Sequence, residues 1–361
     1  MSVQTVPNLP ETYRKYVVHT LSSDFRQATR LETHQLKDLI AKLGPKLVVV
    51  RNKHLGINAS DINFTSGRYD TRVKPPFDCG FEALGEVVAT GPGVKVPLLQ
   101  PVAVMLYGAF SEYQIVHERA LLKIPSLDRR YLALLVTGLT ASLALEYHGR
   151  MKSGETVLVT AAAGATGQIA VQLAKQAGNH VIGTCSSASK AAHLKRLGCD
   201  RVINYREEKL GEVLRKEYPR GVDIVFESVG GDMFRDAMRN LGVRGRMIVI
   251  GAVASYTKKP EPGAKINSFQ AIWTDQVSTA ALLNKSHTVT GFFLNNYNRE
   301  SADHLDKLVR AVQAGTLEAT IDATPYVGLE SVPQAIDAMH RSANTGKLVV
   351  DLAPAGGSAR L

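Results

Sequence analysis

A glycine-rich turn, residues 161–167 (AAAGATG), is the segment of the sequence best suited to binding a reactive group. It follows the buried-strand pattern of residues 156–160 and precedes a helical pattern that starts at Gly167. On the fingerprint G-x-G-x-x-G, Ala162 takes the first glycine position, Gly164 the second and Gly167 the third. Gly164 would let backbone approach a pyrophosphate, Gly167 would let the helix pack closely, and the helix N-terminus would offer N–H groups. The flanking strand and helix favour a dinucleotide-binding turn over a turn without a ligand.

The end of the next strand bears on which dinucleotide is bound. An NAD enzyme usually places a carboxylate there to hold the ribose hydroxyls, whereas residues 184–190 read TCSSASK. Ser186 could donate a hydrogen bond to a 2′-phosphate and Lys190 could supply a point charge, while Tyr205 would arrive from the following strand end. The sequence therefore predicts NADPH as the cofactor. The alternative for Lys190 is a solvated helix residue.

Two kinds of segment surround these motifs. Residues 46–116 contain short β-like runs separated by turns rich in Gly, Pro and Asn. From about Tyr131, helical patterns alternate with buried apolar strands, which is typical of a doubly wound parallel sheet. The run HTVTGFFL, residues 287–294, is expected to close that sheet, and the last apolar strand to pack back onto the first domain. The predicted fold class is α/β, with a β-rich domain beside a parallel-sheet cofactor domain.

Bulk composition narrows the function classes. A chain of 361 residues is expected to form two unequal domains. The formal net charge is +10, but the basic residues are scattered, so we expect no nucleic-acid partner. No apolar run is long enough to cross a bilayer, so we expect no membrane insertion and an intracellular protein. Three cysteines without paired spacing indicate neither a disulfide framework nor a structural zinc site.

Four stretches carry a family resemblance: residues 58–63 (NASDIN) with 67–69 (GRY), 75–94 (PPFDCGFEALGEVVATGPGV), the glycine-rich turn, and 344–347 (NTGK). With them the chain resembles the medium-chain dehydrogenase/reductase superfamily, in its zinc-free quinone oxidoreductase and enone reductase branch, nearest the prostaglandin reductase 3 group. The resemblance implies a GroES-like substrate domain over residues 1–137 and a Rossmann domain over residues 138–300. Residues 301–361 would then return to the GroES-like domain and form the C-terminal tail.

The resemblance also bears on metal. Zinc alcohol dehydrogenases of this superfamily take a catalytic ligand from the histidine of a G-H-E motif, whereas this chain reads Gly80-Phe81-Glu82. A phenyl ring cannot bind zinc, and Glu82 alone cannot hold the ion. We therefore expect no metal, which leaves substrate polarisation to hydrogen bonds and suits conjugate reduction better than alcohol oxidation.

The resemblance implies roles for individual residues. Tyr256, which follows the strand pattern GRMIVIG, is the candidate donor to a developing enolate. Its alternative role is packing beneath the nicotinamide. Asn58 is the second catalytic candidate and would line the nicotinamide pocket, while Asp61 in the same motif fits a loop cap better than a chemical role. Further cofactor contacts implied by the family are Thr166, Ser228, Ile250, Phe292, Phe293, Leu294 and Asn344.

The function expected from these residues is NADPH-dependent conjugate reduction of an α,β-unsaturated ketone. Family resemblance implies 15-oxo-prostaglandin-like lipids as the substrate class. The alternatives are an NADPH quinone oxidoreductase and a non-catalytic NADPH-binding protein. The edge run of residues 287–294 could also pair two copies into a homodimer.

The chain ends in Ala359-Arg360-Leu361, which resembles the Ser-Lys-Leu tripeptide read by the peroxisomal import receptor. The small residues before it would leave the tripeptide accessible. We therefore expect a peroxisomal enzyme. The alternative is an accidental tail on a cytoplasmic one.

Overall fold

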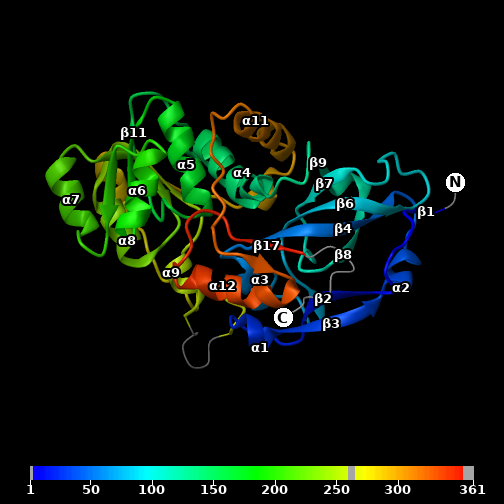
Figure 1. Cartoon of the computed structure of the whole chain (residues 1–361). Helices are drawn as coiled ribbons and strands as arrows, with labels where there is room; N and C mark the ends of the chain where they lie inside the picture. The colour runs from blue at the N-terminus through cyan, green and yellow to red at the C-terminus, as the bar shows by residue number, and fades with distance from the viewer. Residues whose placement is uncertain (1–2, 259–264, 353–361) are drawn as a thin grey trace.

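A computed structural model describes residues 3–258 and 265–352 of the chain (Figure 1). A parallel-sheet domain, green in Figure 1, lies at one end of the molecule, and a β-rich domain, blue to cyan, lies at the other. The C-terminal segment, orange to red, runs back from the first to the second. In the described residues no helix is both long and apolar enough to span a membrane.

The parallel-sheet domain is built on six strands in the order β12-β11-β10-β13-β14-β15, counted over the described residues. Val157 and Val159 of β10 face one core and Leu158 faces another, since successive side chains of a strand point to opposite faces. Both faces are therefore buried, which explains the continuous apolar runs in the sequence. The strands are β10 (Thr156–Val159), β11 (His180–Cys185), β12 (Arg201–Asn204), β13 (Val222–Glu227), β14 (Leu241–Val249) and β15 (Thr288–Gly291).

Helices cover both faces of this sheet. Leu210 and Phe234, from α7 and α8, pack on the face that Leu158 joins, whereas Ile169 of α5 packs on the opposite face. The helices that connect the first five of these strands along the chain, from β10 to β14, are α5 (Ala165–Gln176), α6 (Ala188–Arg196), α7 (Leu210–Glu217) and α8 (Gly231–Arg239). The run of residues 287–294 does close the sheet as expected, but its strand ends at Gly291, and Phe292, Phe293 and Leu294 lie beyond it.

The β-rich domain contains a sheet of eight described strands centred on β4, which pairs with β6, β8 and β17. Val349 of β17 lies opposite Gly56 of β4, so the final apolar strand does pack back onto this domain. Its strands are β1 (Gln4–Thr5), β4 (Leu47–Gly56), β6 (Ala83–Thr90), β7 (Pro101–Val104), β8 (Tyr113–His117), β9 (Leu121–Lys123), β16 (Tyr326–Val327) and β17 (Val349–Asp351).

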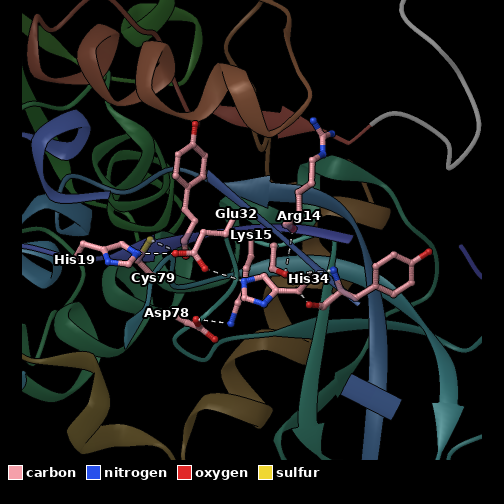
Figure 2. Close-up of polar contacts among 10 residues, drawn as sticks. Arg14, Lys15, His19, Glu32, His34, Asp78 and Cys79 are labelled. Atoms are coloured by element: carbon pink, nitrogen blue, oxygen red, sulfur yellow. Dashed lines mark hydrogen bonds and ion pairs between the residues drawn. The ribbon is translucent and has the colours of Figure 1, made fainter. Parts of the chain in front are cut away.

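A smaller sheet lies in the β-rich half of the molecule, and polar contacts join its strands to one another (Figure 2). Its described strands are β2 (Thr12–Val18), β3 (Thr29–Gln35) and β5 (Phe77–Asp78). Lys15 of β2 pairs with Asp78 of β5 at 2.7 Å, and Glu32 of β3 accepts from His19 at 2.6 Å and from His34 at 2.9 Å. The hydrogen bond from His19 is the main cause of a lowered pKa at Glu32.

The remaining helices include two that lie where the domains meet. Leu139 of α4 and Leu308 of α11 belong to one hydrophobic core that also takes in Leu84 of β6 and Val157 of β10, so a common core runs across the domain junction. The helices are α1 (Phe25–Ala28), α2 (Leu36–Ile40), α3 (Asp61–Thr65), α4 (Val136–Leu143), α9 (Val253–Tyr256), α10 (Thr279–Lys285), α11 (Ser301–Gln313) and α12 (Val332–His340), and the shorter turns are η1 (Glu118–Ala120), η2 (Arg129–Ala133), η3 (Ala144–Gly149), η4 (Leu294–Tyr297) and η5 (Leu329–Ser331).

Candidate active site

A cavity of about 470 Å³ is lined by residues of both domains. Every residue that the sequence suggested for catalysis or cofactor binding lies on its wall, although these residues come from segments far apart in the chain. They are Asn58, Gly164, Thr166, Gly167, Ser186, Lys190, Tyr205, Ser228, Ile250, Tyr256, Phe292, Phe293, Leu294 and Asn344. The structure brings these residues together, and their individual roles stay predictions.

The glycine-rich turn lines the cavity and leaves little room for a side chain at Gly167. Strand β10 ends at Val159, and helix α5 begins at Ala165, two residues earlier than the sequence pattern indicated. No side chain caps this helix, so its first N–H groups are available to an anion. A Cβ on Gly167 would lie 2.5 Å from the carbonyl oxygen of Ala161, which explains the glycine there. The tight turn is made by Ala161, with a φ of 46°, rather than by Ala162.

Lys190 lies on the cavity wall at the start of α6, beside Ser186 and Tyr205. Its Nζ donates to the carbonyl oxygen of Ser342 at 2.7 Å, and in the described part of the chain it forms no ion pair. Burial is the first cause of a lowered pKa at Lys190, and the positive charge of Arg206 contributes in the same direction. A 2′-phosphate beside Lys190 would gain a cationic partner, so the residues present fit NADPH. The sequence analysis did not single out Arg206.

The segment 344–347 fastens the glycine-rich turn to the β-rich domain. The N–H of Gly346 donates to the carbonyl oxygen of Ala163 at 2.9 Å, and Gly346 forms a parallel bridge with Gly164. Asn344 lines the cavity, but its Nδ2 donates to the carbonyl oxygen of Gly346 at 2.8 Å. That side chain therefore stabilises the segment itself, and its contact with the cofactor stays a prediction.

Lys347 and Glu82 form an ion pair with no exposed side-chain surface on either residue. The Nζ of Lys347 also donates to Oδ1 of Asn58 at 2.8 Å, and Nδ2 of Asn58 donates to Oε1 of Glu82 at 3.0 Å. Glu82 lies against Gly56, where a Cβ would come within 2.3 Å of Oε1. Both ends of the Asn58 carboxamide are thus bound within the protein, so this side chain is held in one orientation at the cavity wall.

Asp61 is buried beside this group and accepts from the N–H of Asn58 at 2.8 Å, as expected for a residue that fixes its loop. Its second oxygen, Oδ1, has no hydrogen-bond partner in the described structure. Burial raises the pKa of Asp61 to about 8, while the Asn58 N–H and Lys347 oppose that rise. The carboxyl group is therefore protonated at neutral pH in the folded protein.

The raised pKa of Asp61 makes stability depend on pH. Between its ordinary value of 3.8 and about 8, the folded state holds a proton that the unfolded state has lost, so stability falls as the pH rises through this range. As the pH rises from about 5 to about 8, the wild type is expected to lose at least about 1 kcal/mol more free energy of unfolding than the Asp61→Asn variant, which has no carboxyl group at this position. Urea denaturation of both proteins at the two pH values measures this difference. Glu227, whose pKa burial raises to about 7, contributes equally to both proteins and cancels. A constant difference would contradict the prediction.

Tyr256 is held at the cavity wall by its backbone and its hydroxyl group. Arg68 donates to the Tyr256 carbonyl oxygen at 2.8 Å and also to Oδ1 of Asn63 at 2.8 Å. The N–H of Ala252 donates to the Tyr256 hydroxyl oxygen at 3.3 Å. Burial raises the pKa of Tyr256, so the hydroxyl stays protonated at neutral pH and can act as a donor. The sequence analysis did not identify Arg68 as its support.

Several aromatic side chains line the cavity, and we call four of them, Tyr69, Phe81, Tyr107 and Phe293, the aromatic wall. The Phe81 and Tyr107 rings lie 5.4 Å apart, and the Tyr69 and Phe293 rings stack at 5.6 Å. Phe81, which stands where the resemblance places the histidine of a G-H-E motif, is thus part of an apolar surface. No group of three His, Cys, Asp or Glu in the described residues could hold a metal ion. The expected absence of zinc stays a prediction that metal analysis of the purified protein tests.

Comparisons with known proteins agree with this architecture. Residues 44–126 match the family described as "Alcohol dehydrogenase GroES-like domain", and residues 165–310 match the family described as "Zinc-binding dehydrogenase". Prostaglandin reductase-3 from Bos taurus is 47% identical over 96% of this chain and 91% of its own length. A probable quinone oxidoreductase from Leishmania amazonensis is 41% identical over 95% of this chain and 99% of its own.

A solved structure extends the likeness to three dimensions. The quinone oxidoreductase of Pseudomonas syringae pv. Tomato DC3000 superposes with a TM-score of 0.79 at 26% identity, over 94% of this chain and 99% of that one. The fold is therefore the predicted pairing of a GroES-like domain with a Rossmann domain. With near-complete coverage of relatives that share over two fifths of its residues, the chain belongs to the medium-chain dehydrogenase/reductase superfamily of oxidoreductases.

Proposed function

We propose that the protein catalyses NADPH-dependent conjugate reduction of α,β-unsaturated ketones, with 15-oxo-prostaglandin-like lipids within its substrate class. The observation that carries the proposal is the cavity itself, which has the glycine-rich turn and Lys190 on one part of its wall and the Tyr256 hydroxyl on another. The name of the bovine relative, prostaglandin reductase-3, supports the same reaction class.

Some residues of the cavity would bind the cofactor, and Tyr256 would polarise the substrate's carbonyl group. The N-terminus of α5 would hold the pyrophosphate, and Lys190 with Ser186 would hold the 2′-phosphate. Bound NADPH would supply a hydride to the β-carbon of the enone. As negative charge gathers on the substrate's carbonyl oxygen, the Tyr256 hydroxyl would donate a hydrogen bond to it, which lowers the barrier because that charge is larger in the transition state than in the bound substrate. The enolate would then take up a proton at its α-carbon to give the saturated ketone.

Turnover with a small enone tests the proposal. The purified protein is expected to oxidise NADPH, followed by absorbance, when 3-buten-2-one is added, and the product is expected to be the saturated ketone. Two alternatives have their own signatures. A quinone oxidoreductase, which the Leishmania and Pseudomonas relatives favour by name, would oxidise NADPH with quinones and leave the enone intact. A non-catalytic NADPH-binding protein would bind the cofactor and turn over neither substrate.

Preference for NADPH rests on Lys190. Lys190→Ala is expected to raise the Michaelis constant for NADPH about tenfold or more, because a charge-assisted contact worth about 1 to 3 kcal/mol is lost. The constant for NADH should change little, since NADH has no 2′-phosphate. Steady-state kinetics with both cofactors measure the difference. Lys195→Ala is the matched control, because Lys195 lies in the last turn of the same helix and not on the cavity wall. An equal loss with both cofactors would remove Lys190 from the 2′-phosphate site.

We also propose a peroxisomal location, on the strength of the terminal Ala359-Arg360-Leu361, which lies outside the described residues. A reporter fused to the N-terminus is expected to collect in peroxisomes and to disperse when Leu361 is deleted, with NADPH turnover unchanged. Identical cytosolic distribution of both forms would contradict the import signal.

A homodimer is the remaining part of the proposal. Strand β15 lies at the edge of the parallel sheet, where a second copy could add its own edge strand. Light scattering of the purified protein gives the mass in solution. A monomeric mass at micromolar concentration would contradict pairing through β15.

A further inference from the structure

The aromatic wall suggests which enones the cavity accepts. We propose that it selects α,β-unsaturated carbonyl compounds that carry a large, uncharged apolar substituent beside the alkene, and that any carboxylate elsewhere in the substrate must stay outside the cavity. This inference rests on the proposed function. It concerns the substrate class, so it can fail while conjugate reduction itself holds.

The packing of the aromatic wall is the first observation. Tyr107 stacks on Phe64, with ring centroids 4.0 Å apart and an interplanar angle of 12°, which fixes the orientation of Tyr107. Phe81 packs at a tilt against Tyr107, with ring centroids 5.4 Å apart, and edge-on against Tyr69, with ring centroids 6.1 Å apart. These rings support one another, so the apolar surface that they present is built in advance of substrate binding.

The exposure of two of these rings is the second observation. Tyr107, from the β-rich domain, is 47% exposed, and Phe293, from the end of β15, is 44% exposed. Both lie on the cavity wall, so a ligand in the cavity can cover their faces. Covering apolar surface is favourable by about 25 cal/mol per Å², which a small enone without an apolar substituent cannot exploit.

The charge of the cavity is the third observation. Of the described residues that line it, Lys190 is the one lysine, arginine, histidine or acidic residue, and it is grouped with Cys185, Ser186 and Tyr205 around the end of β11. The aromatic wall offers hydroxyls and ring faces to a ligand. A carboxylate held against it would lose its hydration without gaining a cationic partner, which is costly.

Matched substrates test the inference on the wild-type protein. With trans-4-phenyl-3-buten-2-one, kcat/KM is expected to exceed that with 3-buten-2-one by about tenfold or more, as aryl burial contributes more than 1.4 kcal/mol. A para-carboxylate on the same phenyl ring is expected to lower kcat/KM by about tenfold or more relative to its methyl ester. Equal values within either pair would overturn the inference. Failure to reduce any of these enones, with NADPH bound, would instead overturn the proposed function.

A variant locates the effect on the wall. Tyr107→Ala is expected to lower kcat/KM for the phenyl enone about tenfold more than for 3-buten-2-one, since only the phenyl enone loses an aromatic contact with the wall. Tyr147→Ala is the matched control, because Tyr147 is 46% exposed and lies on η3, away from the cavity wall. An equal loss with both enones would show that Tyr107 supports the fold or the chemistry and does not select the substituent.

Discussion

Replacing Lys347 with methionine is expected to lower the free energy of unfolding by about 3 to 5 kcal/mol, the range found when one partner of a buried ion pair is removed. Lys347 and Glu82 have no exposed side-chain surface, so the Glu82 carboxylate would stay buried without its counter-charge. The Oδ1 of Asn58 would lose its donor as well. Chemical denaturation of the wild type and of the Lys347→Met variant measures the loss.

Two further variants show whether burial is the cause. Lys175 pairs with Asp200 at 2.6 Å on the surface, where its side chain is 42% exposed, so Lys175→Met is expected to cost less than about 1 kcal/mol. The double variant Glu82→Gln with Lys347→Met removes both charges and is expected to recover part of the lost stability. If Lys347→Met were no more destabilising than Lys175→Met, the network would contribute nothing to the fold.

Local patterns predicted the strand, turn and helix that form one side of the cavity. The strand β10, the glycine-rich turn and α5 are contiguous, so spacing alone places Gly164 and Gly167 at the helix N-terminus. The parallel sheet itself followed from the alternation of strand and helix patterns, although the order of its strands was not predicted. The exact start of α5 and the left-handed conformation at Ala161 could not be predicted, because they depend on how the turn meets the neighbouring strand: Thr184 Oγ1 accepts from the Ala161 N–H at 3.0 Å.

Long-range pairings in the rest of the site were beyond the sequence. Lys347 and Glu82 are separated by 265 residues, and no local pattern shows that they meet. A lysine that directly precedes the buried residues 348–350 is a hint that its charge has a partner, but it does not name one. The position of Asn58 on the cavity wall was expected. Its hydrogen bonds to Lys347 and Glu82 were not, and they occupy both ends of its carboxamide. The place of Tyr107 on the cavity wall could not be predicted from the sequence, because its orientation depends on stacking with Phe64.

Replacing Tyr256 with phenylalanine is expected to lower kcat for enones by about 10²- to 10³-fold, the usual loss when one donor to a developing oxyanion is removed. The hydroxyl matters little before charge develops, so the Michaelis constant for NADPH is expected to change by less than about twofold. Its oxygen accepts from the Ala252 N–H at 3.3 Å, which directs the hydroxyl proton elsewhere. Burial raises its pKa, so the proton is present throughout the neutral range. Single-turnover kinetics with 3-buten-2-one, where chemistry can be followed directly, measure the effect.

Stability provides the control for this substitution. Loss of the acceptor leaves the Ala252 N–H unpaired, so Tyr256→Phe is expected to cost about 1 kcal/mol in free energy of unfolding, far too little to unfold the protein. Tyr16→Phe is the matched control, because Tyr16 and Tyr256 are both 7% exposed and pack in the same core cluster, yet Tyr16 does not line the cavity. Its kcat is expected to equal that of the wild type. An unchanged single-turnover rate in Tyr256→Phe would assign Tyr256 to packing beneath the cofactor. Enolate stabilisation would then have to come from another donor on the cavity wall, such as the Tyr69 hydroxyl.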